Sequence, residues 1–259
     1  MSRPAVLVIG GTDSSGCAGI GADLLTISSL GAHAALAVTA VTAQDGDGVS
    51  AIMTVPALVV AEQIAAAMRA CRPAVVKTGM LVDAEVVEVV VAAVRDAGLM
   101  LVVDPVLTST SGARLLDTEG LARMRSGLLP LATLVTPNLA EAIELAPGAP
   151  EPRDQAEAIR RVGATWVVVT GGHASGSPVD LLVGPTGHSE VSGPRVVTRD
   201  DRGTGCTFAS AAAAALAHGD DVATAVRKAG EFVRRGLNAS YPLAGGRGTL
   251  DRTAPAARR

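Results

Sequence analysis

Short apolar runs rich in β-branched residues alternate along the chain with helical segments, and this alternation limits the possible folds more than any other feature. The runs have the length and composition of strands buried on both faces, and they are Val6–Ile9, Leu36–Thr42, Ala74–Lys77, Leu101–Asp104, Leu134–Thr136, Trp166–Thr170 and Asp180–Val183. The helical segments are Ile20–Leu30, Ala57–Ala70, Ala84–Ala97, Thr118–Leu128, Leu139–Leu145 and Gln155–Val162. A strand–helix series of this kind predicts a mainly parallel sheet with helices on both faces.

The pattern changes after Val183. Gly184–His188 predicts a turn, and Ser189–Thr198 predicts an antiparallel edge strand. The proline-rich stretch Ala146–Pro152 predicts a loop within one domain, because the strand–helix series continues after it. We therefore expect a single domain over residues 1–259.

Composition limits the class of partner. With 48% apolar residues but only one Trp, one Tyr and two Phe, the core must consist mainly of aliphatic side chains. A net charge of −3 without a basic cluster argues against nucleic acid, and no apolar run approaches the roughly 18 residues of a membrane span. Three cysteines without a C-x-x-C spacing predict neither disulfides nor zinc. We expect a cytoplasmic protein that binds small molecules.

A glycine turn at the start of an alanine-rich helix, within Asp201–Ser210, predicts an anion-binding site. Gly203 and Gly205 allow successive backbone N–H groups to point at one position, where the helix dipole adds roughly half a positive charge. Such donors stabilise charge that develops during phosphoryl transfer. The alternative is that Thr204 caps a helix that only packs against the sheet.

The first glycine-rich loop, Gly11–Gly16, follows the first strand. It has the spacing of a P-loop, but Cys17 and Ala18 stand where that motif requires Lys and Ser or Thr. The glycines that follow it are spaced in the reverse order of the dinucleotide fingerprint. The loop is therefore predicted to approach a ligand closely, and the alternative is an ordinary strand–helix turn.

Polar residues near the strand ends are further candidates. Asp23, early in the first helix, can complement the helix dipole or accept a hydrogen bond from a ligand amine. Gln44 follows the second strand, and its amide can donate to and accept from a heteroaromatic ring.

Acidic residues at two other strand ends predict a magnesium site. Asp104 ends a strand at Pro105, whereas Asn138 and Glu141 lie three residues apart on one helix face. Glu141 either belongs to a capping arrangement or, with Asp104, offers hard oxygen ligands for Mg²⁺ near an ATP phosphate. Thr170–His173 adds another close-approach loop at the same edge.

Eight segments, in order, resemble those of the hydroxymethylpyrimidine/phosphomethylpyrimidine kinases of the ribokinase-like superfamily. They are Gly11–Gly19, Ala22–Asp23, Thr42–Gln44, Lys77–Met80, Asp104–Val106, Thr136–Glu141, Gly171–His173 and Gly203–Cys206. The resemblance covers nearly the whole chain, and Thr-Pro-Asn-x-x-Glu together with Gly-Thr-Gly-Cys is specific to this branch.

The resemblance implies an α/β fold, namely a three-layer α/β/α sandwich. It also implies that the protein uses ATP and Mg²⁺ and forms a homodimer. The implied reaction is phosphorylation of 4-amino-5-hydroxymethyl-2-methylpyrimidine, and then of its monophosphate, in thiamine biosynthesis. By position, the residues that would line the substrate pocket are Gly11, Asp23, Gln44, Met80, Val106 and Cys206. Those that would serve the nucleotide and metal are Asn138, Glu141, Thr170, Gly171, Gly172 and the turn Gly203, Thr204, Gly205.

The chain departs from the family pattern near the phosphates. Thr170 stands before Gly-Gly-His, and Thr110 before Ser-Gly, where members commonly have lysine, so two positive charges are lost. Arg202 is the candidate to restore one of them. The alternatives are a pyridoxal kinase-like enzyme, since pyridoxal also carries a hydroxymethyl group, and a catalytically silent ligand-binding paralogue, which Thr170 favours and Asp104 and Glu141 oppose.

Cys206 is predicted to act as a general base. In the first turn of the helix its thiolate would be favoured by the dipole, which would lower its pKa, and many sugar kinases of the superfamily carry an aspartate here. The thiolate could then accept the proton of the substrate hydroxymethyl group. The alternative is that Cys206 only shapes the pocket.

Overall fold

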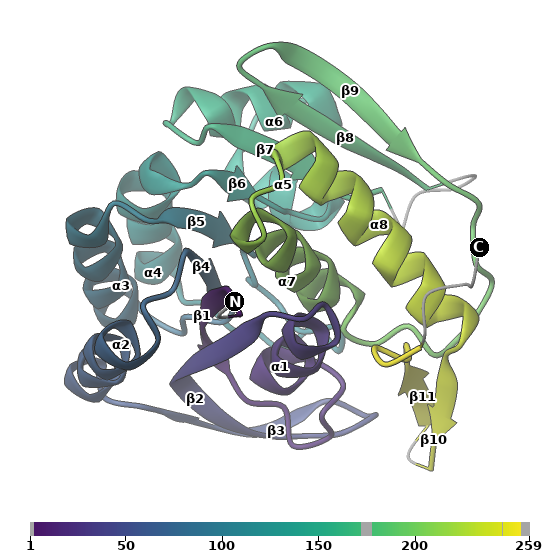
Figure 1. Ribbon diagram of the computed structural model, residues 1–259, viewed down its shortest axis with the longest axis horizontal. Coiled ribbons are helices and arrows are strands. Elements are labelled where there is room, and N and C mark those ends of the chain that lie inside the picture. Colours follow the sequence, from purple (N-terminus) through teal and green to yellow (C-terminus); the bar gives the residue numbers. More distant parts are fainter. Residues whose placement is uncertain (1–2, 172–177, 245, 255–259) are drawn as a thin grey trace.

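A nine-stranded sheet is the centre of the computed structural model, which describes residues 3–171, 178–244 and 246–254 (Figure 1). Its strands lie in the order β3-β2-β1-β4-β5-β6-β7-β8-β9. Their bounds are β1 (Ala5–Gly11), β2 (His33–Gln44), β3 (Val49–Thr54), β4 (Val75–Thr78), β5 (Met100–Val103), β6 (Leu134–Val135), β7 (Trp166–Val169), β8 (Val179–Gly184) and β9 (Gly187–Ser192). The six central strands are parallel, and β3, β8 and β9 extend the two edges in antiparallel fashion.

Helices cover both faces of the sheet, as the strand–helix series predicts. One face packs against α1 (Gly19–Ser29), α7 (Thr204–Ala217) and α8 (Val222–Asn238). The other packs against α2 (Ala57–Cys71), α3 (Ala84–Ala97), α4 (Thr118–Arg123), which continues as a π-helix over Met124–Leu128, η2 (Leu129–Leu131), α5 (Leu139–Leu145) and α6 (Pro152–Arg161). The chain therefore folds as a three-layer α/β/α sandwich. Helices α7 and α8 lie side by side on the same face of the sheet (Figure 1).

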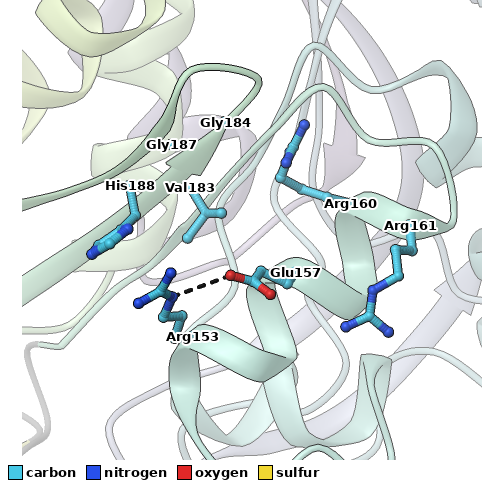
Figure 2. A pocket seen from close by; sticks show the side chains of 8 residues that line it. All are labelled: Arg153, Glu157, Arg160, Arg161, Val183, Gly184, Gly187 and His188. Carbon is cyan, nitrogen blue, oxygen red and sulfur yellow. Dashed lines mark hydrogen bonds and ion pairs between the residues drawn. The ribbon is translucent and has the colours of Figure 1, made fainter.

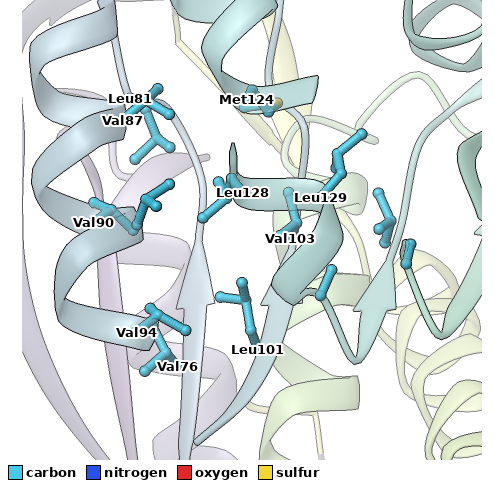
Figure 3. Close-up of a cluster of buried hydrophobic side chains, with 14 of the residues drawn as sticks. Val76, Leu81, Val87, Val90, Val94, Leu101, Val103, Met124, Leu128 and Leu129 are labelled. Atoms are coloured by element: carbon cyan, nitrogen blue, oxygen red, sulfur yellow. The ribbon is translucent and has the colours of Figure 1, made fainter. Parts of the chain in front are cut away.

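Aliphatic side chains fill the core, as the shortage of aromatic residues predicts. On the face covered by α3, Val87, Val90 and Val94 of that helix pack with Leu101 and Val103 of β5 (Figure 3). On the opposite face α7 contributes mainly buried alanines and therefore approaches the sheet closely. This close approach places the first turn of α7 beside the loops that follow the strands.

Several elements differ from the sequence-based expectation. The predicted helix Thr118–Leu128 widens into a π-helix for its last five residues, and the expected strand Ser189–Thr198 ends at Ser192. Strand β3, helix α8 and the hairpin of β10 (Tyr241–Leu243) and β11 (Gly246–Thr249) were not predicted. Helix α8 carries a readable signal, because Asp221 caps it by accepting a hydrogen bond from the N–H of Thr224. None of the helices in the described ranges is long and apolar enough to cross a membrane.

Candidate active site

Most of the predicted site residues meet at one edge of the sheet. Because β2, β1, β4, β5, β6 and β7 are parallel, their carboxyl ends lie together. The residues at or just after these ends are Gln44, Gly11, Met80, Asp104, Asn138 and Thr170. Ligands of open α/β sheets bind at this edge.

The glycine turn before α7 has the predicted geometry. Gly203 is the N-cap, and its φ of 79° lies in the left-handed region that favours glycine. An added Cβ atom at Gly203 would lie 1.9 Å from the carbonyl oxygen of Cys17, so the two glycine-rich loops touch there. Thr204 is the first helical residue and makes no side-chain cap, so the alternative that it caps the helix is wrong. The backbone N–H groups at the start of α7 are the candidate anion donors.

A buried lysine, Lys77 at the end of β4, lies beneath this turn. Its Nζ atom is 3.0 and 3.1 Å from the two carboxylate oxygens of Asp23 and 3.3 Å from Oδ2 of Asp104. Ser210 of α7 donates a further hydrogen bond of 2.6 Å to Asp23. Burial opposes charge on Lys77, but the two carboxylates outweigh it and raise the lysine pKa. Sequence reasoning quoted Lys77 in a motif but gave it no role, although a lysine ending a buried apolar strand is itself a signal.

Asp23 does not sit where the sequence suggested. It is the fifth residue of α1, so the expected interaction with the helix dipole is wrong. Burial raises its pKa, and contact with Lys77 opposes that rise. Its carboxylate is held inside the protein by Lys77 and Ser210, and its contact with a ligand stays a prediction.

Cys206 is partly buried in the first turn of α7. Burial raises the pKa of its thiol, the carboxylates of Asp104 and Asp23 raise it further, and Lys77 only partly opposes them. The predicted lowering of this pKa is therefore wrong, because desolvation and two nearby negative charges outweigh the helix dipole. At neutral pH the thiol is protonated and cannot accept a proton from the substrate.

We expect Cys206→Ala to lower kcat by less than about tenfold, because phosphoryl transfer depends mainly on positioning and electrostatics. A general base would contribute about 10²- to 10⁴-fold. Steady-state kinetics with saturating nucleotide measures the difference, and Cys71→Ala, a change at a half-buried cysteine on α2, is the matched control. A loss of 10²-fold or more confined to Cys206→Ala would restore the base role.

Asp104 and Glu141 are the two predicted metal ligands. Asp104 is buried, and its Oδ2 atom, which is 3.3 Å from Nζ of Lys77, accepts no hydrogen bond from the described residues. Glu141 and Asn138 form a capping box, with reciprocal hydrogen bonds of 2.9 and 3.0 Å to each other's backbone N–H groups. Burial, helped by nearby Asp104, raises the pKa of Glu141 to about 8. The capping alternative for Glu141 is thus confirmed, and metal binding stays a prediction.

The substrate-side residues gather at the ends of β1, β2 and β4. A Cβ atom at Gly11 would lie 2.9 Å from the sulfur of Met80, so these two residues are in contact. Met80 and Val106 belong to one small apolar cluster. Gln44 ends β2, where the hydroxyl of Ser14 donates to its carbonyl and accepts from its N–H, each over 2.7 Å. This fixes the Gln44 backbone against the first loop.

The nucleotide-side residues gather at the ends of β6 and β7. Thr170 forms a parallel bridge with Asn138, and its N–H donates to the carbonyl of Pro137 over 2.9 Å. At Gly171 a Cβ atom would lie 2.0 Å from the carbonyl oxygen of Val179, so only glycine fits. Gly172 lies outside the described residues.

Arg202 does not replace the missing lysines. Its guanidinium is buried and lies 3.4 Å from Oδ2 of Asp13. The Asp13 carboxylate also accepts hydrogen bonds from two backbone N–H groups of the first loop region, that of Ser15 at Oδ1 and that of Ala18 at Oδ2. The charge of Arg202 is therefore used to hold the first loop. The expectation that it serves the phosphates is wrong, because sequence alone does not reveal the ion pair with Asp13.

A separate shallow hollow lies far from these residues, between α6 and the β8–β9 turn (Figure 2). Since β8 is antiparallel to β7, this turn lies at the amino ends of the parallel strands. The side chains that line the hollow include His188 and Arg153, and Arg153 pairs with Glu157 over 3.1 Å. No residue predicted for the site lines it.

Comparison with known proteins agrees with this geometry. A family model described as phosphomethylpyrimidine kinase matches residues 13–251. Hydroxymethylpyrimidine/phosphomethylpyrimidine kinase of Mycobacterium tuberculosis is 44% identical over 259 residues, covering 96% of this chain and 94% of the relative. The kinase of the same name from Streptomyces coelicolor is 41% identical, covering 97% and 95%.

Solved structures give the same fold. An ADP complex of Bacillus subtilis pyridoxal kinase superposes with a TM-score of 0.90 at 31% identity, covering 98% of each chain. Phosphomethylpyrimidine kinase of Clostridium difficile superposes with a TM-score of 0.78 at 33% identity, covering 90% of this chain and 98% of that one. Both structural neighbours are kinases.

Proposed function

The chain belongs to the phosphomethylpyrimidine kinase family and is a phosphotransferase, and we propose that it phosphorylates the hydroxymethyl group of 4-amino-5-hydroxymethyl-2-methylpyrimidine with ATP. A second transfer to the resulting monophosphate gives the diphosphate, as thiamine biosynthesis requires. The observation that carries the proposal is the contact between the Gly203 turn and the first loop, beside the buried Asp104. An anion bound at this contact would lie next to the predicted substrate pocket.

The residues divide the work of the transfer. Backbone N–H groups from Gly203 to Cys206 face the transferring phosphoryl group and stabilise its charge without reorganisation. Asn138, Thr170 and Gly171 serve the nucleotide at the ends of β6 and β7. Lys77 is neutralised by Asp23 and Asp104 and holds both carboxylates in place. The hydroxymethyl proton leaves to solvent or phosphate oxygen, because Cys206 is protonated.

Mg²⁺ fits the donor set. Oδ2 of Asp104 is buried and accepts no hydrogen bond, although Nζ of Lys77 lies 3.3 Å away, and the charge of Asp104 acts on nearby Glu141. Mg²⁺ often binds through one or two carboxylates with water and phosphate, so Asp104 and Glu141 would be enough protein ligands for it. Bound there, Mg²⁺ would neutralise phosphate charge.

Pyridoxal kinase activity is the second candidate, favoured by the TM-score of 0.90 to the Bacillus subtilis enzyme. Gln44 supports the pyrimidine, because its amide, near the apolar residues Gly11, Met80 and Val106, can pair with a ring nitrogen and an adjacent amine together. A silent paralogue is not supported, because relatives that are 41% and 44% identical over nearly the whole chain are kinases, and the chain keeps Asp104, Glu141 and the Gly203 turn.

Mass spectrometry of the products tests the proposed reaction. With ATP and Mg²⁺, the pyrimidine alcohol should gain one phosphate and then a second, with one ADP formed at each step. Exhaustive incubation that left the alcohol unmodified would contradict the function, and accumulation of the monophosphate alone would contradict the second step.

We also propose that the protein is a homodimer that joins through β3. This edge strand is uncharged and exposed along most of its length, and Met53 is 64% exposed. At the start of α2, Leu58 is 74% and Val59 47% exposed. An uncharged edge suits a second copy of itself, because a two-fold partner presents the same surface and can pair with its free backbone groups.

Sedimentation equilibrium should find the wild type as a dimer and Met53→Glu as a monomer, because the mutation places two like charges at a two-fold contact. Val197→Glu is the matched control, since Val197 is 93% exposed but follows β9, at the opposite edge of the sheet. A monomeric wild type would contradict the proposal.

A further inference from the structure

Arg252, in the segment after β11, is a buried arginine close to the anion-binding turn. It is only 4% exposed. Its Nε donates to the hydroxyl of Thr207 over 2.9 Å, and Nη1 donates to the hydroxyl of Thr249 over 3.0 Å. Its Nη2 donates to the carbonyl of Cys17 and, over 3.4 Å, to that of Arg202. The guanidinium thus joins its own C-terminal segment to two distant parts of the chain, the end of the first loop and the start of α7.

The charge of Arg252 has no direct ion-pair partner in the described part of the chain. All four of its acceptors are neutral hydroxyl or carbonyl oxygens. The Asp23 carboxylate lies near enough to favour the charged guanidinium, but no ion pair joins the two side chains. Lys77 and Arg202, the neighbouring buried cations, are paired with acids. A guanidinium stays protonated in proteins, and a buried unpaired charge is costly. A phosphate bound at the Gly203 turn would add the negative charge that no direct partner supplies.

The guanidinium also lies directly behind the turn. A Cβ atom at Gly203 would lie 2.3 Å from Nη2 of Arg252 and 1.9 Å from the carbonyl oxygen of Cys17. The left-handed turn, the first glycine-rich loop and the guanidinium therefore meet at one point. Thr207, which receives the Nε hydrogen bond, in turn donates its own hydroxyl to the carbonyl of Gly203 over 2.7 Å.

We propose that Arg252 is a positioning residue for phosphoryl transfer. It fixes the Gly203 turn against the first loop and supplies, from behind the turn, the positive charge that the phosphates of the nucleotide require. This inference rests on the proposed function for the identity of the anion.

Two substitutions separate the charge from the hydrogen bonds. Arg252→Gln keeps a polar donor but removes the charge, and Arg252→Lys keeps the charge but loses the forked geometry. Arg247→Gln is the control, because Arg247 lies in the same C-terminal segment, is more exposed and pairs with Asp201. Calorimetry measures the affinity for AMP-PCP and for AMP, at low and high salt.

We expect Arg252→Gln to weaken AMP-PCP binding and lower kcat, each by about 10- to 100-fold, while AMP binding and the KM for the alcohol stay within about threefold. Arg252→Lys should recover most of the AMP-PCP affinity, and salt should reduce its advantage over Arg252→Gln. Arg247→Gln should match the wild type.

Unchanged AMP-PCP affinity in Arg252→Gln would overturn the proposal. Equal losses in the glutamine and lysine variants, shared by AMP, would assign Arg252 a purely structural role and also overturn it. If Arg252→Gln does not fold, Arg252→Lys alone provides the test. An Arg252→Lys protein that folds but binds AMP-PCP as weakly as it binds AMP would also overturn the proposal. A wild type that binds AMP-PCP but transfers no phosphate would contradict the proposed function and leave the Arg252 comparison valid.

Discussion

Replacing Gly203 by alanine is expected to lower kcat by about 10²- to 10³-fold, because it displaces the backbone donors that stabilise the transferring phosphoryl group. The new Cβ atom would lie 1.9 Å from the carbonyl oxygen of Cys17 and 2.3 Å from Nη2 of Arg252, at a φ of 79° that alanine rarely adopts. The turn must therefore move away from the first loop. Steady-state kinetics with ATP and the pyrimidine alcohol measures the loss.

Gly219→Ala is the matched control for this experiment. Gly219 follows the carboxyl end of α7, its φ of 93° is also in the left-handed region, and an added Cβ atom there meets nothing within 4 Å. Both variants should show native circular dichroism at the assay temperature. Gly203→Ala with the kcat of Gly219→Ala would mean that the turn does not take part in the transfer.

Replacing Lys77 by methionine is expected to lower the free energy of unfolding by about 3–5 kcal/mol, because it leaves two buried carboxylates without their cation. Asp23 and Asp104 are 1% and 4% exposed, so water cannot compensate them. Urea denaturation followed by circular dichroism gives the value.

The control for Lys77 is a lysine in an exposed ion pair. Lys228 lies 2.6 Å from Asp220 with a side chain 50% exposed, and Lys228→Met should cost only about 0–1 kcal/mol. If Lys77→Met cost no more than Lys228→Met, the buried lysine would not hold the two carboxylates together.

The sequence predicts the scaffold well because the scaffold depends on local patterns. Apolar runs such as Leu101–Asp104 can be buried on both faces only in a covered sheet, and the helices Ala84–Ala97 and Leu139–Leu145 have the predicted bounds. The glycine turn at Gly203 was also predicted, since few other residues permit its backbone. Strand β3 was not predicted because it has no alternating pattern and is exposed along most of its length.

The charges of the site could not be predicted in the same way. Arg252 donates to the carbonyl of Cys17 from 235 positions further along the chain, and Arg202 pairs with Asp13 from 189 positions away. Cys206 was expected to ionise because of its helix, but its pKa depends on burial and on Asp104 and Asp23. Such long-range contacts decide which groups are charged, and a motif does not contain them.

The most direct test of the proposed function is the ratio of kcat/KM for the pyrimidine alcohol to kcat/KM for pyridoxal, measured with the same enzyme, ATP and Mg²⁺. Gln44, beside the apolar residues Gly11, Met80 and Val106, predicts a ratio above about ten, because a polar group that a bound ring covers without pairing it costs about 1–3 kcal/mol. A ratio below one, with pyridoxal the better substrate, would contradict the proposed substrate and make the enzyme a pyridoxal kinase.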